Sequence, residues 1–225
     1  MGLTQFTKMT LLSNNMTYKY IFLVGAPGSR WSSVNRNIYY SNSIDTTDFS
    51  EQRQYWHDWY NPKAPKLMHL GAYFDPGMEF GDFFDKLDQH SKEECEAEFD
   101  RPFTGGGVRI IKAHVFADHI DFIKKTWPEC PIVLCYRDDD ACLGWWVKCG
   151  HFNITYPLYH EYYKNLQTMG HIIDSQNLAI RRAIDIHAAK PVATNEELCK
   201  LMGISCPSEE FYQVYKQAGV EVFLV

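Results

Sequence analysis

The chain has 225 residues, of which 45% are hydrophobic and 22% charged, an ordinary globular composition, and we expect residues 1-225 to form a single domain with a substantial core. Its formal net charge of -6 argues against a general nucleic-acid binder, because such a protein needs a basic face to neutralise phosphates, so any anion site must be local. Seven cysteines without a CxxC pair, and no apolar stretch near the roughly 18 residues of a membrane span, indicate a cytoplasmic protein with reduced thiols and no zinc site.

The first predicted element is a buried strand from Tyr18 to Val24, an apolar, aromatic and β-branched run that stops at Gly25. A helix is predicted from about Trp31 to Tyr40, and either Ser29 or Ser32 is available to cap it. The loop that joins this strand to this helix is the first candidate site.

Two glycines in the loop, Gly25 and Gly28, allow the backbone to turn tightly and to approach a ligand closely. Serine hydroxyls follow at the helix N-terminus, where free amides favour an anion. We therefore interpret the loop as a phosphate or sulfate cradle, the alternative being a tight turn that holds no ligand. It is neither a Walker A loop nor GxGxxG, which disfavours a nucleotide triphosphatase. The residues assigned to the cradle are Gly25, Ala26, Pro27, Gly28, Ser29, Arg30, Trp31 and Ser32.

Residues 41-80 have no clear period over most of their length and are predicted to form a long loop. Its aromatic residues either stack on a sugar or a planar ring of a ligand or, as is more usual, anchor the loop to the core. These residues are Trp56, Trp59, Tyr60 and Tyr73. An acidic helical segment at about 82-100, centred on a helix from Phe83 to Glu98, comes next and ends in three glycines.

The second half of the chain alternates strands and helices. Strands are predicted at 108-114 and 131-137, each followed by a helix, and the helix at 117-130 places Ile120, Ile123 and Trp127 on one face. One or two helices broken near Gly170 follow. A last helix is predicted to start at Thr194 or Asn195, before a final strand, VEVFLV.

Three apolar strands, each followed by a helix, predict an α/β fold: a three-layer sandwich with a central, mostly parallel sheet and a P-loop-like anion-binding loop. In such sheets ligands bind at the carboxyl ends of the strands. The ends of the three strands carry the Gly25-Ser33 loop, the pair Lys112 and His114, and Arg137. We expect these groups to share one cleft.

Lys112 and His114 lie two residues apart, so in an extended segment their side chains face the same way. Histidine accepts a proton near neutral pH, and an ammonium stabilises negative charge on a leaving oxygen. The alternative is a solvated lysine beside a hydrogen-bonded histidine at the sheet edge. Arg137 is suited to a phosphate, or else pairs with one of the three aspartates that follow it.

In this order, the loop GAPGSRW, the stretch IIKAH and the stretch IVLCYR before a helix resemble the PAPS-dependent sulfotransferase family, as a divergent and short member. The family's loop reads like PKSGTTW, its catalytic stretch like KTHLP, and its 3'-phosphate stretch like RNPKDVAVS. The helix NEELCKLMGIS is similar to the family's closing helix. The resemblance implies that the loop holds the 5'-phosphosulfate of PAPS and that Arg137 binds the 3'-phosphate. It also implies that His114 deprotonates the acceptor while Lys112 assists the leaving phosphate.

The chain departs from the family at three places. The loop lysine falls on Ala26, the serine after Arg137 falls on Trp145 or Gly144, and no late RKGxxGDW stretch is present. Arg30 is a candidate to replace the lysine charge. The expected reaction is metal-free sulfuryl transfer from PAPS, with PAP as product, to a hydroxyl or amine of a small-molecule or carbohydrate acceptor. The alternative is a catalytically impaired nucleotide- or anion-binding protein that keeps the fold.

Overall fold

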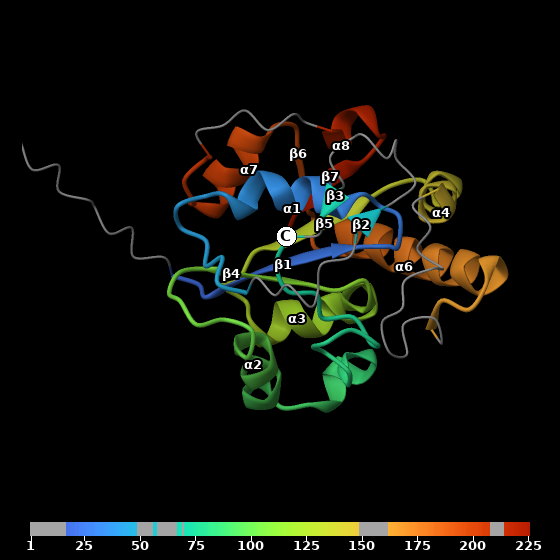
Figure 1. The fold of residues 1–225 in the computed structure, drawn as a ribbon. Helices are drawn as coiled ribbons and strands as arrows, with labels where there is room; N and C mark the ends of the chain where they lie inside the picture. Colours follow the sequence, from blue (N-terminus) through green and yellow to red (C-terminus); the bar gives the residue numbers. More distant parts are fainter. Residues whose placement is uncertain (1–16, 49–55, 58–66, 69, 149–161, 208–213) are drawn as a thin grey trace, which may run out of the picture.

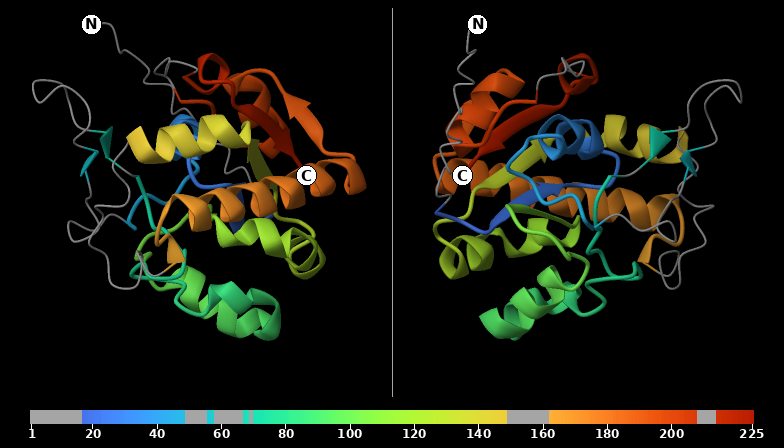
Figure 2. Two further views of the ribbon diagram at one scale, coloured as in Figure 1. Left: turned by 90° about the vertical axis from the view of Figure 1, so that its right-hand side faces the viewer. Right: turned by 60° about the vertical axis from the view of Figure 1, so that its left-hand side comes forward.

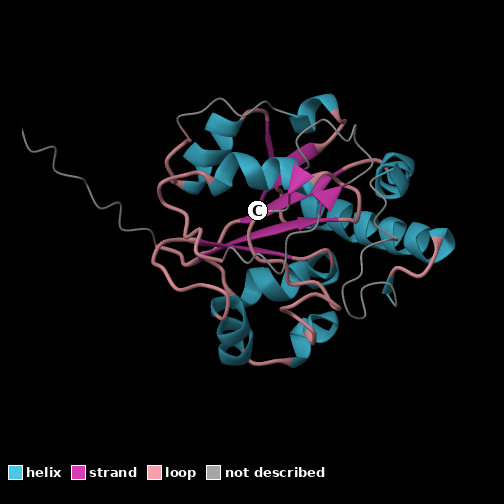
Figure 3. Ribbon diagram, viewed as in Figure 1, coloured by secondary structure: helices cyan, strands magenta, loops and turns pink. Residues whose placement is uncertain are grey.

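The computed structural model describes residues 17-48, 56-57, 67-68, 70-148, 162-207 and 214-225. Within these residues the main sheet has five strands in the order β4-β1-β5-β7-β6 (Figures 1 and 3). The strands are β1 (Tyr20–Gly25), β4 (Arg109–Lys112), β5 (Ile132–Tyr136), β6 (Lys190–Val192) and β7 (Glu221–Leu224). β1 pairs in parallel with β4 and with β5, whereas β7 is antiparallel to both β5 and β6, so four of the five strands point the same way.

The central strand β1 is buried on both faces. Ile21 and Leu23 belong to one hydrophobic cluster, called here the α1-side cluster, and Tyr20, Phe22 and Val24 belong to another, the α3-side cluster. A strand that buries both faces needs apolar residues at every position instead of at alternate ones. This explains the uninterrupted run from which β1 was predicted.

Helices pack against both clusters (Figure 1). The α1-side cluster receives residues from α1 (Trp31–Tyr39), α4 (Asp139–Lys148) and α7 (Asn195–Met202). The α3-side cluster receives residues from α2 (Lys92–Asp100) and α3 (Ile120–Thr126). The long helix α6 (Leu166–Ile186) contributes to both and runs beside α4 (Figure 2). Shorter elements are η2 (Phe84–Gln89), η3 (Val115–His119) and α8 (Val214–Gln217). None of the helices that the structure describes has the length and apolar character needed to cross a bilayer.

Several local predictions were wrong. The helix break near Gly170 does not exist, because α6 is continuous through it and is anchored in the core on either side by Met169 and Ile173. The acidic segment at about 82-100 is divided into η2 and α2, and Ser91 caps α2 with a reciprocal capping box to Glu94. Neither serine caps α1, whose N-cap is Arg30.

The region 41-80, predicted to be a long loop, contains a two-stranded antiparallel sheet of β2 (Trp56–His57) and β3 (Leu67–Met68). Trp59 and Tyr60 lie outside the described residues. Tyr73 is buried in the α1-side cluster and so anchors this region to the core, which is the second of the two roles considered for these aromatic residues.

Candidate functional site

The turn after β1 begins with a hydrogen bond from the Ser29 amide to the carbonyl oxygen of Ala26, at 3.0 Å. Gly28 has φ +81°, and Arg30 has φ 65° in the left-handed region, a conformation that side-chain-bearing residues adopt only at an energetic cost. The chain then enters α1 at Trp31. Ala26 and Pro27, the first two residues of the turn, are both buried.

Packing against protein explains both glycines of the turn. A Cβ atom at Gly28 would overlap the carbonyl oxygen of Cys142 in α4. A Cβ atom at Gly25 would lie 2.5 Å from Ser29 Oγ and 3.1 Å from the carbonyl oxygen of Cys135. The glycines therefore allow the turn to pack on α4 and β5, whereas the sequence analysis assigned them to the close approach of a ligand.

Ser29 has a polar atom without a protein partner. Its side chain is fully buried, and Oγ makes no hydrogen bond within the described part of the chain. A buried hydroxyl that forms no hydrogen bond costs about 1–3 kcal/mol, so it calls for an explanation, and a contact with a ligand is one. Ser32, the second residue of α1, is half-buried.

His114 lies two residues after the end of β4, at the N-cap of η3, and is only 3% exposed. Its Nδ1 is 2.5 Å from the carbonyl oxygen of Gly25, the last residue of β1. The imidazole stacks on the Trp31 ring with a centroid distance of 4.0 Å and an interplanar angle of 17°. Edge-to-face contacts with Tyr73 and Trp146 complete an aromatic enclosure.

Asp75 faces His114 from the segment that follows Tyr73. Its Oδ2 is 3.9 Å from His114 Nε2, and both side chains are buried. Burial lowers the pKa of His114, while the Asp75 charge and the Gly25 hydrogen bond oppose that shift. Burial raises the pKa of Asp75, opposed by His114 and by hydrogen bonds from Tyr73 and from the backbone. The sequence analysis missed Asp75, which no local motif singles out.

Lys112 is the last residue of β4 and is 2% exposed, so the predicted alternative of a solvated lysine was wrong. Its ammonium donates a hydrogen bond to the carbonyl oxygen of Leu70, which also accepts one from Asn35 Nδ2 at 2.9 Å. Burial is the main cause that lowers the pKa of His114, and the Lys112 charge lowers it further. The two side chains bond to different carbonyl oxygens, those of Leu70 and Gly25. The lysine also ties the segment before Tyr73 to the end of β4.

Arg137 follows β5 and is half-buried. Its Nη1 donates a hydrogen bond to the carbonyl oxygen of Gly28 at 3.1 Å, and its Nε donates one to Ala218 at 2.8 Å. The neighbouring Asp138 instead accepts the Ala141 amide at the start of α4.

Asp139 and the carbonyl oxygen of Arg137 both accept hydrogen bonds from Asn177 Nδ2, at 2.5 and 2.8 Å. In the described residues no ion pair joins Arg137 to a carboxylate. Asn177, from α6, is a second residue of this region that the sequence analysis missed.

Comparisons with protein-family models, with curated proteins and with solved structures find no match. The assignment of function therefore depends on the geometry of the site. The turn after β1 is contacted at Gly25 by His114 and at Gly28 by Arg137. Arg30 lies over the Trp145 ring of α4, 4.0 Å from its centroid.

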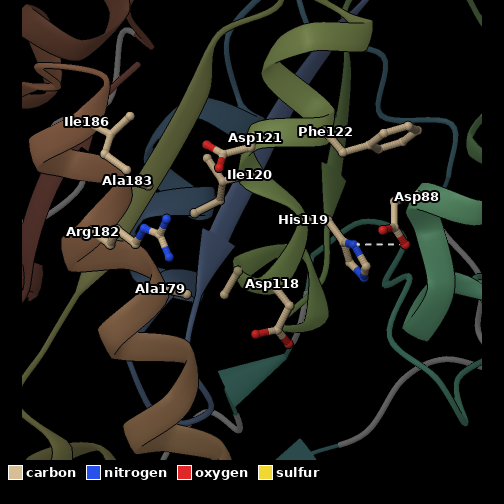
Figure 4. Close-up of a pocket in the computed structure, with 11 residues that line it drawn as sticks. Asp88, Asp118, His119, Ile120, Asp121, Phe122, Ala179, Arg182, Ala183 and Ile186 are labelled. Atoms are coloured by element: carbon tan, nitrogen blue, oxygen red, sulfur yellow. Dashed lines mark ion pairs between the residues drawn. The ribbon is translucent and has the colours of Figure 1, made fainter.

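A separate pocket of about 270 Å³ lies between η3, α3 and α6 (Figure 4). Arg182 and three aspartates line it, and His119 faces Asp88 at 3.6 Å. Because carboxylates outnumber cations there, the pocket does not suit a nucleotide that carries several phosphates. Within the described residues, no three histidine, cysteine or carboxylate side chains are placed to hold a metal ion. The carboxylates that line the pocket are Asp88, Asp118 and Asp121.

Proposed function

We propose that the chain is a short, divergent sulfotransferase, built as a three-layer α/β sandwich with a P-loop-like turn. In this proposal it transfers a sulfuryl group from PAPS to a hydroxyl or amine of a small-molecule or carbohydrate acceptor. The observation that carries the proposal is that one turn is contacted at Gly25 O by His114 and at Gly28 O by Arg137. The proposed base and the proposed phosphate-binding cation thus contact the same turn, to which the proposal assigns the phosphosulfate.

The chemistry of the turn fits a phosphosulfate. Ser29 Oγ is an unpartnered buried donor, and it lies at the N-terminus of α1, whose dipole favours negative charge. Arg137 adds a guanidinium, the group that binds a phosphate in a two-pronged manner. Ala26 offers no charge where the family has a lysine, and the residue of the turn that carries a positive charge is Arg30, whose guanidinium lies over the Trp145 ring.

When bound, PAPS supplies a sulfuryl group that is already activated by its phosphate leaving group. The protein then has to position the acceptor, take its proton and stabilise negative charge. In this proposal His114 takes the proton of the acceptor. Lys112, which is buried beside it, stabilises the negative charge. Loss of one charge-stabilising contact costs on the order of a hundredfold in rate or more, so Ala26 predicts a slow enzyme unless Arg30 compensates.

The burial of the two proposed catalytic groups favours a second candidate. His114 and Lys112 are 3% and 2% exposed, and the ammonium of Lys112 is hydrogen-bonded to Leu70. A nucleotide- or anion-binding protein that keeps the turn and Arg137 but transfers no sulfuryl group accounts for this enclosure equally well. The two candidates differ in turnover, not in nucleotide affinity.

Calorimetric titration of the full chain with PAP, ATP and AMP tests both candidates. A clear preference for PAP supports a PAPS site, and equal or absent affinity for the three nucleotides contradicts it. Transfer from ³⁵S-labelled PAPS to a panel of hydroxyl and amine acceptors then separates enzyme from binder. We expect His114→Gln to retain PAP affinity and to lose transfer. Persistent transfer by this variant would remove His114 as the base.

A further inference from the structure

The hydrogen bond between His114 and Gly25 fixes which ring nitrogen is available for chemistry. A carbonyl oxygen only accepts hydrogen bonds, so Nδ1, at 2.5 Å from Gly25 O, must carry a hydrogen. In the neutral imidazole Nε2 then holds the lone pair. The proton that His114 takes up must therefore arrive at Nε2.

Asp75 is held in place opposite this nitrogen. Its Oδ1 accepts the Val115 amide at 3.0 Å, and the Phe74 amide donates to the carbonyl oxygen of Lys112 at 3.0 Å. The segment that carries Asp75 is thereby fixed to the end of β4. Oδ2 is fully buried, makes no hydrogen bond within the described residues, and lies 3.9 Å from His114 Nε2.

The groups around the pair come from several elements. Trp31 of α1, Trp146 of α4 and Tyr73 enclose the imidazole with aromatic rings, and Tyr73 donates a hydrogen bond to Asp75. The charges that act on the pair are Lys112 at the end of β4 and Asp118 on η3, which interact electrostatically with His114 and Asp75 respectively. In this apolar enclosure the two facing groups interact more strongly than they would in water.

We propose that Asp75 is the positioning residue of His114, with its carboxylate facing Nε2 and stabilising the imidazolium that forms when the acceptor gives up its proton. This inference rests on the proposed function, because it assigns a partner to the proposed base. The acceptor O–H bond breaks and its proton moves to Nε2 while the acceptor oxygen bonds to sulfur. The bond from sulfur to the phosphate oxygen breaks, and its electron pair stays on the phosphate. Asp75 itself takes no proton from the acceptor.

The pKa of His114 tests the pair without any need for catalysis. In protein labelled with ¹⁵N-histidine, the His114 signal is identified by its loss in His114→Gln and is followed against pH. Asp75→Asn keeps an oxygen for the Val115 amide but removes the charge. We expect this variant to lower the pKa of His114 by about one to three units, the usual effect of losing an opposite charge at this range.

The matched control is Asp48→Asn. Asp48 is also a buried carboxylate; it accepts hydrogen bonds from Tyr39 at 3.1 Å and from the Ala72 amide, and asparagine keeps an oxygen for such a donor while it removes the charge. This variant should leave the His114 pKa unchanged. An unchanged His114 pKa in folded Asp75→Asn, or an equal shift in Asp48→Asn, would overturn the proposal.

A measurement on the unmodified chain covers the case in which Asp75→Asn does not fold. The ¹³C signal of the Asp75 carboxyl and the ¹⁵N signal of His114 Nε2 should respond to a common titration, because charges this close are coupled. Two independent titrations would overturn the inference.

The rate of sulfuryl transfer separates this inference from the proposed function. His114 acts as a base only when Nε2 is free, so the rate falls as the pH drops below the His114 pKa. In Asp75→Asn the fall should move to lower pH, with a lower plateau. Coupled titration without any transfer by the unmodified chain would support the pair and contradict the sulfotransferase. Transfer with a pH profile that Asp75→Asn leaves in place would support the enzyme and contradict the pair.

Discussion

Arg137 Nη1 lies 3.1 Å from the carbonyl oxygen of Gly28, so one hydrogen bond joins the end of β5 to the turn that follows β1. A guanidinium held in this position keeps further N–H groups, since it has five donors in a rigid fork. Those donors are what the proposed 3'-phosphate site requires.

Arg137→Ala should weaken PAP binding by about tenfold to a hundredfold, the usual worth of hydrogen bonds to a charged group. Calorimetry with PAP measures the change. Arg182→Ala is the control, because Arg182 is exposed on α6 and lines the acidic pocket instead. Equal PAP affinity in the unmodified chain and in folded Arg137→Ala would exclude Arg137 from the nucleotide site.

Ser29→Ala should stabilise the fold and weaken PAP binding. The hydroxyl is buried without a protein partner, so its removal relieves a desolvation cost of about 1 kcal/mol, while the nucleotide loses a donor. Urea unfolding and calorimetry measure the two effects. Opposite signs for stability and affinity are characteristic of a residue kept for a ligand.

Ser91→Ala is the matched control for this prediction. Ser91 Oγ accepts the Glu94 amide at 3.2 Å in the capping box of α2. Its replacement should cost about 1 kcal/mol of stability and leave PAP affinity unchanged. If Ser29→Ala also destabilises the protein and binds PAP normally, Ser29 belongs to the fold alone.

Gly28→Ala should strongly destabilise the folded protein. The new Cβ atom would overlap the Cys142 carbonyl, and alanine would have to adopt the φ of +81° that Gly28 has. We therefore expect the free energy of unfolding to fall by more than about 2 kcal/mol. Thermal unfolding measures it. Gly170→Ala is the control, because a Cβ atom there meets nothing within 4 Å and α6 is helical, which should add about 0.5–1 kcal/mol. Tolerance of alanine at Gly28 would show that α4 moves away from the turn.

Local signals explain which elements could be predicted from the sequence. The start of α7 was found because Thr194 and Glu197 form a capping pattern within four residues, and the Thr194 side chain does accept the Glu197 amide. The strand β6 was missed because Lys190 and Pro191 are typical of an exposed edge and give no apolar alternation. The break expected at Gly170 was overridden by packing on either side of it.

In the candidate site, too, the residues at the strand ends could be predicted from the sequence, whereas their contacts with distant segments could not. The β4-β1-β5 order brings three strand ends together, so the places of His114 and Arg137 could be predicted from topology. The partners of these residues could not. Asp75 reaches His114 through a segment fixed by tertiary hydrogen bonds, and Asn177 reaches Arg137 from α6. Burial of Lys112 likewise depends on the Leu70 carbonyl, which no pattern in the chain connects to it.

The buried imidazole should make the protein less stable in mild acid. Burial holds the pKa of His114 below its ordinary value, so below about pH 6.5 the unfolded chain binds a proton that the folded chain does not. The free energy of unfolding should then decrease by up to about 1.4 kcal/mol for each pH unit, until the folded pKa is reached.

His114→Gln removes this dependence, so the difference in free energy of unfolding between the unmodified chain and the variant should decrease as the pH falls below about 6.5. Asp75 acts in the opposite sense, because its raised pKa stabilises the fold as the pH falls. Measuring His114→Gln in an Asp75→Asn background separates the two contributions. His171→Gln, at an exposed position on α6, controls for the exchange itself. A difference that stays constant across this range would mean that His114 is charged in the folded protein, stabilised there by the Asp75 carboxylate strongly enough to overcome its burial.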